Sequence, residues 1–278
     1  MLFSTFYFSG TGNTKWAIEK FSHIVNQNGH QAELYSIDNF DDCSSKDFAR
    51  IIRESSYIGF ANPIYGADIP PIMKRFINCL TDIMKAEKIH SKPLYIINTF
   101  GYVNACGPIE IEKLLDKDCF ILMAYANIRF CNNISTYRHK SRLISREKLI
   151  ARKKQAVKTI EIMVSRLLVS KKYIRGIGLY LLPGIIIRKK SKIAIENNYR
   201  SLSIQIKSCN MCMTCIRNCP TNCIRFNGEQ FSFSDKCTSC MRCYNFCPTS
   251  SILIDGVFTD PNEYFRYRGL EKTMKINM

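Results

Sequence analysis

Eight of the 14 cysteines form two copies of one short pattern in the last third of the chain. Each copy is written C-x2-C-x2-C-x3-C-P, and the second follows the first by 28 positions. Pro220 and Pro248 repeat at the same offset, as do Thr221 and Thr249. An internal repeat of this kind indicates two copies of one small supersecondary unit. The eight cysteines are Cys209, Cys212, Cys215, Cys219, Cys237, Cys240, Cys243 and Cys247.

This spacing favours iron–sulfur clusters over zinc. In such a run, three closely spaced thiolates hold one cluster, and the fourth cysteine binds the cluster of the other run. Zinc ribbons use two C-x2-C pairs with a longer insert, and they lack the third cysteine and the C-P ending. Because all eight positions are cysteine, we expect two complete [4Fe–4S] clusters. One cluster is assigned to Cys209, Cys212, Cys215 and Cys247, and the other to Cys237, Cys240, Cys243 and Cys219.

The six other cysteines are expected to be structural. Cys223 aligns with Ser251 in the repeat, and a ligand there would break the internal symmetry, so we interpret it as a small buried side chain. Free cysteines are common in protein interiors. Disulfides are not expected, because the sequence shows no export signal. The remaining five are Cys43, Cys79, Cys106, Cys119 and Cys131.

Residues 1–172 alternate between apolar runs and helical patterns. A long helical periodicity covers 146–169. Strands joined by crossover helices predict an α/β fold with a doubly wound parallel sheet. Five segments are expected to form its strands: 2–8, 31–37, 57–61, 94–99 and 120–126.

A loop rich in glycine and threonine joins the first expected strand to the first expected helix. Glycines let the backbone turn sharply and approach a ligand, and a helix N-terminus with nearby hydroxyls attracts an anion. The loop is not a Walker A motif, and Lys15 stands where a complete G-x-G-x-x-G would have its last glycine. Its sequence is Ser9-Gly10-Thr11-Gly12-Asn13-Thr14.

This hexapeptide resembles the phosphate loop of flavodoxins, [ST]-x-T-G-x-T. The resemblance implies a flavodoxin-like sheet of five strands in the order 2-1-3-4-5 with FMN as cofactor, bound at the carboxyl ends of the strands. In flavodoxin-like proteins two further loops flank the isoalloxazine ring, and here Tyr65, Phe100 and Tyr102 are the candidates to cover it. Trp16 is expected to pack in the interior. The corresponding loops are Asn62-Pro63-Ile64-Tyr65-Gly66 and Asn98-Thr99-Phe100-Gly101-Tyr102.

Three segments are therefore expected. Residues 1–172 form the FMN-binding domain, 173–200 an apolar and basic connector, and 201–278 a small α+β, bacterial ferredoxin-like domain with a tail. This combination is similar to a family of flavodoxin-plus-ferredoxin fusion proteins of anaerobic bacteria and some protists, the EFR-type ferredoxins. The resemblance covers about 1–170 and 205–256, and it implies a redox protein.

The net charge of +17 is compatible with nucleic acid, an anionic membrane surface or an acidic protein as partner, and by itself it does not choose among them. Lys and Arg concentrate between Arg138 and Lys207, which suits docking to an acidic ferredoxin or flavodoxin. No nucleic-acid-binding motif accompanies the charge. The apolar stretch 177–187 is too short to span a bilayer, although a peripheral membrane contact remains an alternative. A cytoplasmic location is expected.

The leading hypothesis is an electron-transfer flavoprotein, in which the protein positions and tunes its cofactors. No side-chain constellation for acid–base or nucleophilic catalysis is recognised, so no catalytic residue is assigned. Two alternatives stay open. One is a flavin-dependent reductase of a small organic substrate supplied with electrons by the clusters. The other is a non-enzymatic iron–sulfur assembly or docking module.

Overall fold

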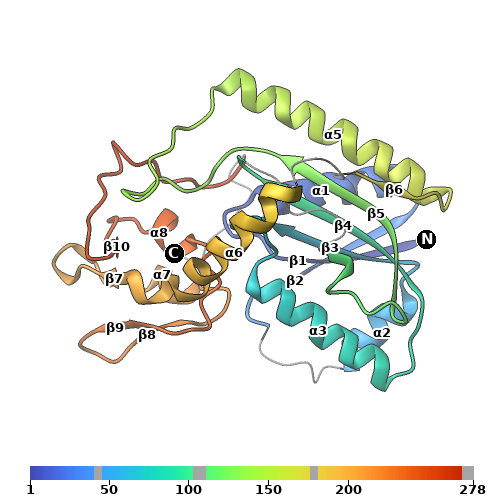
Figure 1. Ribbon diagram of the computed structural model, residues 1–278, viewed down its shortest axis with the longest axis horizontal. Helices are drawn as coiled ribbons and strands as arrows, with labels where there is room; N and C mark the ends of the chain where they lie inside the picture. The colour runs from blue at the N-terminus through green and yellow to red at the C-terminus, as the bar shows by residue number, and fades with distance from the viewer. Residues whose placement is uncertain (41–45, 103–110, 176–180, 271–278) are drawn as a thin grey trace.

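The computed structural model describes residues 1–40, 46–102, 111–175 and 181–270. A parallel sheet with helices on both faces forms the larger part (Figure 1). A smaller part, built from the two cysteine motifs, lies beyond one end of its strands. Helix α6 (Leu181–Asn197) lies between the two parts.

The sheet has six parallel strands in the order β2-β1-β3-β4-β5-β6. All seven residues of the third strand are buried, as expected for a strand covered on both faces. The flavodoxin-like order of the five predicted strands is confirmed. The sixth strand was not predicted, because it has two residues and no period to detect. The strands are β1 (Leu2–Tyr7), β2 (Gln31–Ser36), β3 (Tyr57–Pro63), β4 (Lys92–Phe100), β5 (Phe120–Arg129) and β6 (Tyr173–Ile174).

Two pairs of helices cover the two faces of the sheet (Figure 1). α1 (Asn13–Gln27) and α5 (Arg146–Leu168) bury their apolar faces in one core. α2 (Lys46–Glu54) and α3 (Pro71–Ala86) contribute to the core on the other face. Trp16 packs in the first of these cores, with its ring edge-on to that of Phe130 at 5.3 Å between centroids. Its predicted packing role is confirmed.

The expected connector is largely helical. Ile187, Ser191 and Ile195 of α6 lie on its inward side, toward the carboxyl ends of the strands. Gly66 permits this close approach, because a Cβ there would lie 2.4 Å from the Cβ of Ser191. A 3-10 turn, η1 (Asn198–Ser201), follows. Within the described ranges, no helix combines the length and apolar character that crossing a membrane requires.

The smaller part repeats its backbone as well as its sequence. β7 pairs with the distant β10, and β8 pairs with β9, both antiparallel. Met213 and Met241 both adopt a left-handed conformation directly before the short helices of the two motifs. The elements are β7 (Leu202–Ile204), η2 (Ile206–Ser208), α7 (Thr214–Arg217), β8 (Ile224–Phe226), β9 (Phe231–Phe233), α8 (Arg242–Phe246) and β10 (Ile252–Ile254).

The chain beyond β10 returns to the larger part. Leu270 is buried in the core formed by α1 and α5. The backbone N–H of Tyr267 donates to Asn245 Oδ1 at 2.8 Å, and its hydroxyl donates to Asn13 Oδ1. The segment up to residue 270 therefore joins the second cysteine motif to the first turn of α1.

Candidate redox site

The eight motif cysteines line two separate cavities, in the crossed arrangement that the spacing predicts. Each cavity combines three cysteines of one motif with the fourth cysteine of the other. The cavity of the first motif is lined by Cys209, Cys212, Cys215 and Cys247. The cavity of the second motif is lined by Cys237, Cys240, Cys243 and Cys219.

Backbone amides support the two crossing cysteines in the same way. The N–H of Cys223 donates to Cys219 Sγ, and the N–H of Ser251 donates to Cys247 Sγ, both at 3.3 Å. Burial raises the pKa of the Cys215 and Cys240 thiols to about 11 each. Metal binding requires thiolates, so loading these cavities releases protons. Amide donors that point at sulfur favour the charged form that the ligands must adopt.

The non-motif cysteines differ in their surroundings. Cys223 is buried, as predicted, and its Sγ lies 3.4 Å from Cys219 Sγ at the edge of the second cavity. Cys119 and Cys131 are free and buried. Cys79 in α3 is disulfide-bonded, so the expectation of no disulfides is wrong at this position. Cys43 and Cys106 lie outside the described residues.

The glycine- and threonine-rich loop wraps around a small cavity at the start of α1. Ser9 Oγ accepts hydrogen bonds from the backbone N–H groups of Gly12 and Lys15, each at 3.2 Å, which fixes the turn. Gly12 has φ 105°, a conformation that favours glycine. No acidic residue lies in the first turn of α1, so the positive end of the helix dipole is left for an anion.

The two other predicted loops reach the same cavity. Thr14 and Thr99 share a hydrogen bond between their hydroxyls at 2.8 Å. Asn62 lies buried in β3, with its amide donating to the carbonyl of Pro63. The residues that line the small cavity are Ser9, Gly10, Thr11, Asn13, Thr14, Pro63, Ile64, Tyr65, Thr99, Phe100, Gly101, Cys131 and Asn133.

Tyr65 provides a test of whether this cavity fits a phosphorylated ligand. Its ring is buried, and its hydroxyl has no hydrogen-bond partner among the described residues. A Cβ at Gly10 would lie 2.1 Å from that hydroxyl oxygen, so the hydroxyl fills the space that glycine leaves open. A buried hydroxyl without a partner is costly, and a phosphate or ribityl oxygen would satisfy it. Burial raises the pKa of Tyr65 well above its usual value, so it stays a donor.

A larger cavity of about 580 Å³ adjoins the small one and shares Ile64, Tyr65, Gly101 and Asn133 with it. This volume lies in the range of about 300–1,000 Å³ that is usual for small-molecule sites. Tyr102, 53% exposed, lines it with its ring edge-on to His139. Its other walls come from α6, from the segment after β5, and from Ser239 and Met241 of the second cysteine motif.

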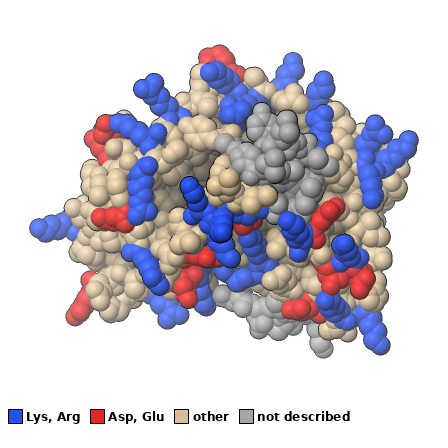
Figure 2. All heavy atoms as spheres, in the orientation of Figure 1, with Lys and Arg blue, Asp and Glu red and all other residues tan. Residues whose placement is uncertain are grey.

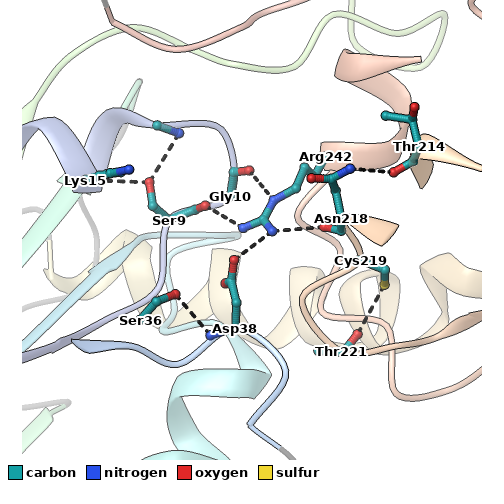
Figure 3. A network of polar contacts seen from close by, with 11 residues as sticks. Ser9, Gly10, Lys15, Ser36, Asp38, Thr214, Asn218, Cys219, Thr221 and Arg242 are labelled. Carbon is teal, nitrogen blue, oxygen red and sulfur yellow. Dashed lines mark hydrogen bonds and ion pairs between the residues drawn. The ribbon is translucent and has the colours of Figure 1, made fainter. Parts of the chain in front are cut away.

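Sequence reasoning missed several residues of this site. Asn133 follows β5 and donates to Thr11 Oγ1 at 2.8 Å. Arg242 lies between two ligand cysteines of the second motif and bonds to the glycine- and threonine-rich loop (Figure 3). A signal for Arg242 was present, because the repeat places Thr214 at the equivalent position of the first motif.

The comparisons with known proteins address the two parts separately. Residues 206–222 and 233–253 each match a family described as a 4Fe-4S binding domain. No curated protein matches the chain. Together with the strand order, these matches define a fusion of a flavodoxin-like α/β part with a ferredoxin-type iron–sulfur part.

Three of the solved structures with a similar fold each cover between 59% and 61% of this chain. A flavodoxin from the domain Archaea is 16% identical, with 59% of this chain and 99% of that chain covered and a TM-score of 0.38. A WrbA-like flavodoxin from Agrobacterium tumefaciens is 15% identical, with 61% and 99% covered and a TM-score of 0.44. The flavodiiron protein from Giardia intestinalis is 16% identical, with 61% of this chain but 36% of that protein covered and a TM-score of 0.37.

Proposed function

We propose that this chain is an electron-transfer iron–sulfur flavoprotein that passes electrons between two [4Fe–4S] clusters and FMN, in the manner of the EFR-type ferredoxins. The observation that carries this proposal is the shared wall of the two kinds of site. The large cavity beside the glycine- and threonine-rich loop is bounded by Ser239 and Met241, which flank the ligand Cys240. A flavin there and a cluster in the second cavity would be neighbours.

The roles of the side chains follow from the geometry. Ser9 orients the loop amides, and Thr11 and Thr14 place hydroxyls in the small cavity, where a phosphate would bind. Tyr65, whose hydroxyl has no partner among the described residues, lines both cavities. Tyr102 and Ile64 offer apolar surface to the ring. When bound, FMN supplies the ability to exchange one or two electrons, while each cluster exchanges one.

The composition of the anaerobically purified protein tests this proposal. We expect about eight irons, eight sulfides and one FMN per chain, with the broad visible absorption of iron–sulfur clusters. Stoichiometric zinc without that absorption would contradict the cluster assignment. Full iron without flavin would instead favour the assembly or docking module.

The large cavity also favours a second candidate function, that of a flavin-dependent reductase. Tyr65 and Tyr102 both line it, and it opens beside the place where the ring would lie. A reductase is expected to oxidise its reduced flavin at a rate that saturates with one small organic acceptor. An electron carrier is expected to saturate with a redox protein instead.

We further propose that the redox partner is an acidic protein that docks near α6. Lys and Arg side chains are spread over the face in Figure 2 and outnumber the acidic ones there. Lys189 and Lys190 are exposed on α6, close to the cavity-lining Ile187 and Ser191. Arg188 is not available for docking in the same way, because its Nε donates to the carbonyl of Ala67 at 3.0 Å.

Reversing both exposed charges, by Lys189→Glu with Lys190→Glu, is expected to slow electron delivery from an acidic ferredoxin while iron and flavin contents stay unchanged. Electrostatic steering is strong at low salt, and the Debye length falls from about 30 Å at 0.01 M to about 10 Å at 0.1 M. The rate of the wild-type protein should therefore drop across that window, and the rate of the variant should change less.

The matched control is Lys154→Glu with Lys158→Glu on α5, which makes the same change in net charge on a helix that covers the sheet. Equal slowing by both pairs would mean that net charge alone matters. Competition by duplex DNA as strong as that by ferredoxin would point to nucleic acid as the partner.

A further inference from the structure

Arg242 is a buried arginine that joins the two parts of the molecule. The residue is 4% exposed. Its Nε donates to the carbonyl of Gly10 at 3.0 Å, and Nη2 donates to the carbonyl of Ser9 at 2.8 Å. Its Nη1 pairs with Asp38 Oδ2 at 2.8 Å. Figure 3 shows the guanidinium at the centre of these contacts.

The same guanidinium also holds the second cysteine cavity together. Nη1 donates to the carbonyl of Asn218 at 2.9 Å, directly before the crossing ligand Cys219. Arg242 itself stands between the ligands Cys240 and Cys243. One planar side chain therefore contacts both chain segments that supply ligands to this cavity and the loop that lines the small cavity. Only arginine offers a rigid fork of donors for so many acceptors at once.

Other contacts place the second cavity, rather than the first, against the larger part. Cys240 belongs to the same buried cluster as Phe8 and Tyr65. A Cβ at Gly10 would lie 3.3 Å from the carbonyl oxygen of Cys240. The carbonyl of Pro220 accepts from the N–H of Asn39 at 2.7 Å, and Thr238 Oγ1 accepts from the N–H of Ile72 at 3.3 Å.

The first motif has a different residue at the equivalent position. Thr214 stands 28 positions before Arg242, and it is buried within the smaller part. Its carbonyl accepts from Asn218 Nδ2 at 2.8 Å, which is a local contact. The described residues that line the first cavity all lie between Ile204 and Ile252. The two halves of the repeat therefore face different surroundings.

We propose that the cluster of the second motif is the one that exchanges electrons with the flavin, and that Arg242 is the positioning residue that couples this cluster to the phosphate loop. The inference rests on the proposed function and adds an order to it: the first cluster exchanges electrons with the flavin through the second cluster. Electron tunnelling weakens steeply with distance. The contacts of Arg242, called the Arg242 clamp below, hold the second cavity against the phosphate loop and so determine this order.

Single-cluster variants test the order without measuring turnover. Cys212→Ala should leave only the second cluster, and Cys237→Ala only the first. The samples are depleted of flavin and titrated with FMN in the presence of excess dithionite, so that the added FMN is reduced by dithionite and does not oxidise the cluster. The electron paramagnetic resonance signal and the midpoint potential of the remaining cluster are followed during the titration. In Cys212→Ala we expect FMN to shift both the resonance signal and the midpoint potential of the remaining cluster. In Cys237→Ala we expect FMN to leave the signal and the potential unchanged. The wild-type protein, with both signals, serves as the reference.

Variants of Arg242 test the clamp. Arg242→Lys keeps the positive charge but loses the planar set of N–H donors of the guanidinium. Arg242→Met combined with Asp38→Asn removes the Arg242–Asp38 ion pair without leaving a buried carboxylate unpaired. We expect about tenfold weaker FMN binding in both and loss of the FMN-dependent shift, with eight irons retained. Arg217→Met, which removes an exposed arginine of α7, is the matched control and should behave as the wild type.

The outcomes separate this inference from the function on which it rests. Absence of FMN from the wild-type protein would overturn both. An FMN-dependent shift confined to the first cluster would overturn the inference and leave the proposed function standing. Unchanged FMN affinity and an unchanged shift in both Arg242 variants, with eight irons retained, would remove Arg242 from the coupling.

Discussion

Replacing Cys219 with alanine is expected to remove the cluster of the second motif and to leave that of the first intact. Cys219 lies in the first motif, but its side chain lines the cavity of Cys237, Cys240 and Cys243. A [4Fe–4S] cluster needs four thiolates, so loss of one ligand should lower the iron content from about eight to about four per chain.

The readout must identify which cluster is lost. Cysteines that bind a cluster are protected from alkylation. If the protein is alkylated with its clusters in place, mass spectrometry therefore identifies the cysteines that bind no cluster. In Cys219→Ala we expect alkylation of Cys237, Cys240 and Cys243. Alkylation of Cys209, Cys212 and Cys215 instead would show that the ligation is not crossed.

Cys223→Ala serves as the control variant, and Cys223 is also a thiol that could replace the missing ligand in Cys219→Ala. Its Sγ lies 3.4 Å from Cys219 Sγ, and it lines the same cavity. Cys223→Ala alone should keep both clusters, because the spacing and the crossed geometry give the second cavity four ligands without it. If Cys219→Ala retains eight irons, the double variant Cys219→Ala with Cys223→Ala shows whether Cys223 has replaced the missing ligand. The reciprocal variant, Cys247→Ala, should lose the first cluster.

The parts of this molecule that sequence reasoning predicted are those whose geometry is local. Four cysteines and a proline within 12 positions define a cluster-binding loop, because the spacing itself sets which thiolates meet. The glycines and hydroxyls at 9–14 similarly define an anion site between a strand and a helix. Buried parallel strands such as β3 read as continuous apolar runs, so their positions were also predictable, whereas β2 at the edge of the sheet alternates between exposed and half-buried residues.

The parts that were missed depend on contacts between distant positions. Arg242 contacts residues more than 200 positions away, and its neighbours in sequence give no reason to expect them. α6 was interpreted as a connector because glycines and Pro183 interrupt its apolar run. A proline in the first turn of a helix is tolerated, so this punctuation did not exclude a helix. Its inward residues then became one wall of the large cavity.

Gly66 shows how a correct location can carry a different role. The resemblance placed it among the residues that flank the flavin, and it does line the large cavity. Its φ of 54° and the 2.4 Å approach of Ser191 show that it also makes room for α6. The close packing of α6 on this loop could not be foreseen from either segment alone.

Gly12→Val is expected to abolish FMN binding at micromolar flavin. Valine at φ 105° is strained, at a cost of about 1–3 kcal/mol, and its branched side chain occupies the approach to the helix N-terminus. Gly29→Val is the matched control, because Gly29 also has a positive φ, of 77°, but lies at the far end of α1 with open space around it. Both variants should lose folding stability in chemical denaturation.

Only Gly12→Val should lose flavin affinity, which fluorescence titration of the flavin-depleted protein measures. Thr14→Ala provides a graded companion, because it removes a hydroxyl from the cavity without straining the backbone. If that hydroxyl donates to a phosphate, its loss costs about 1.5–3 kcal/mol, or roughly 10- to 150-fold in affinity. The expected order of FMN affinity is therefore wild type equal to Gly29→Val, then Thr14→Ala, then Gly12→Val. Equal affinities in all four proteins would show that this loop does not bind the flavin phosphate.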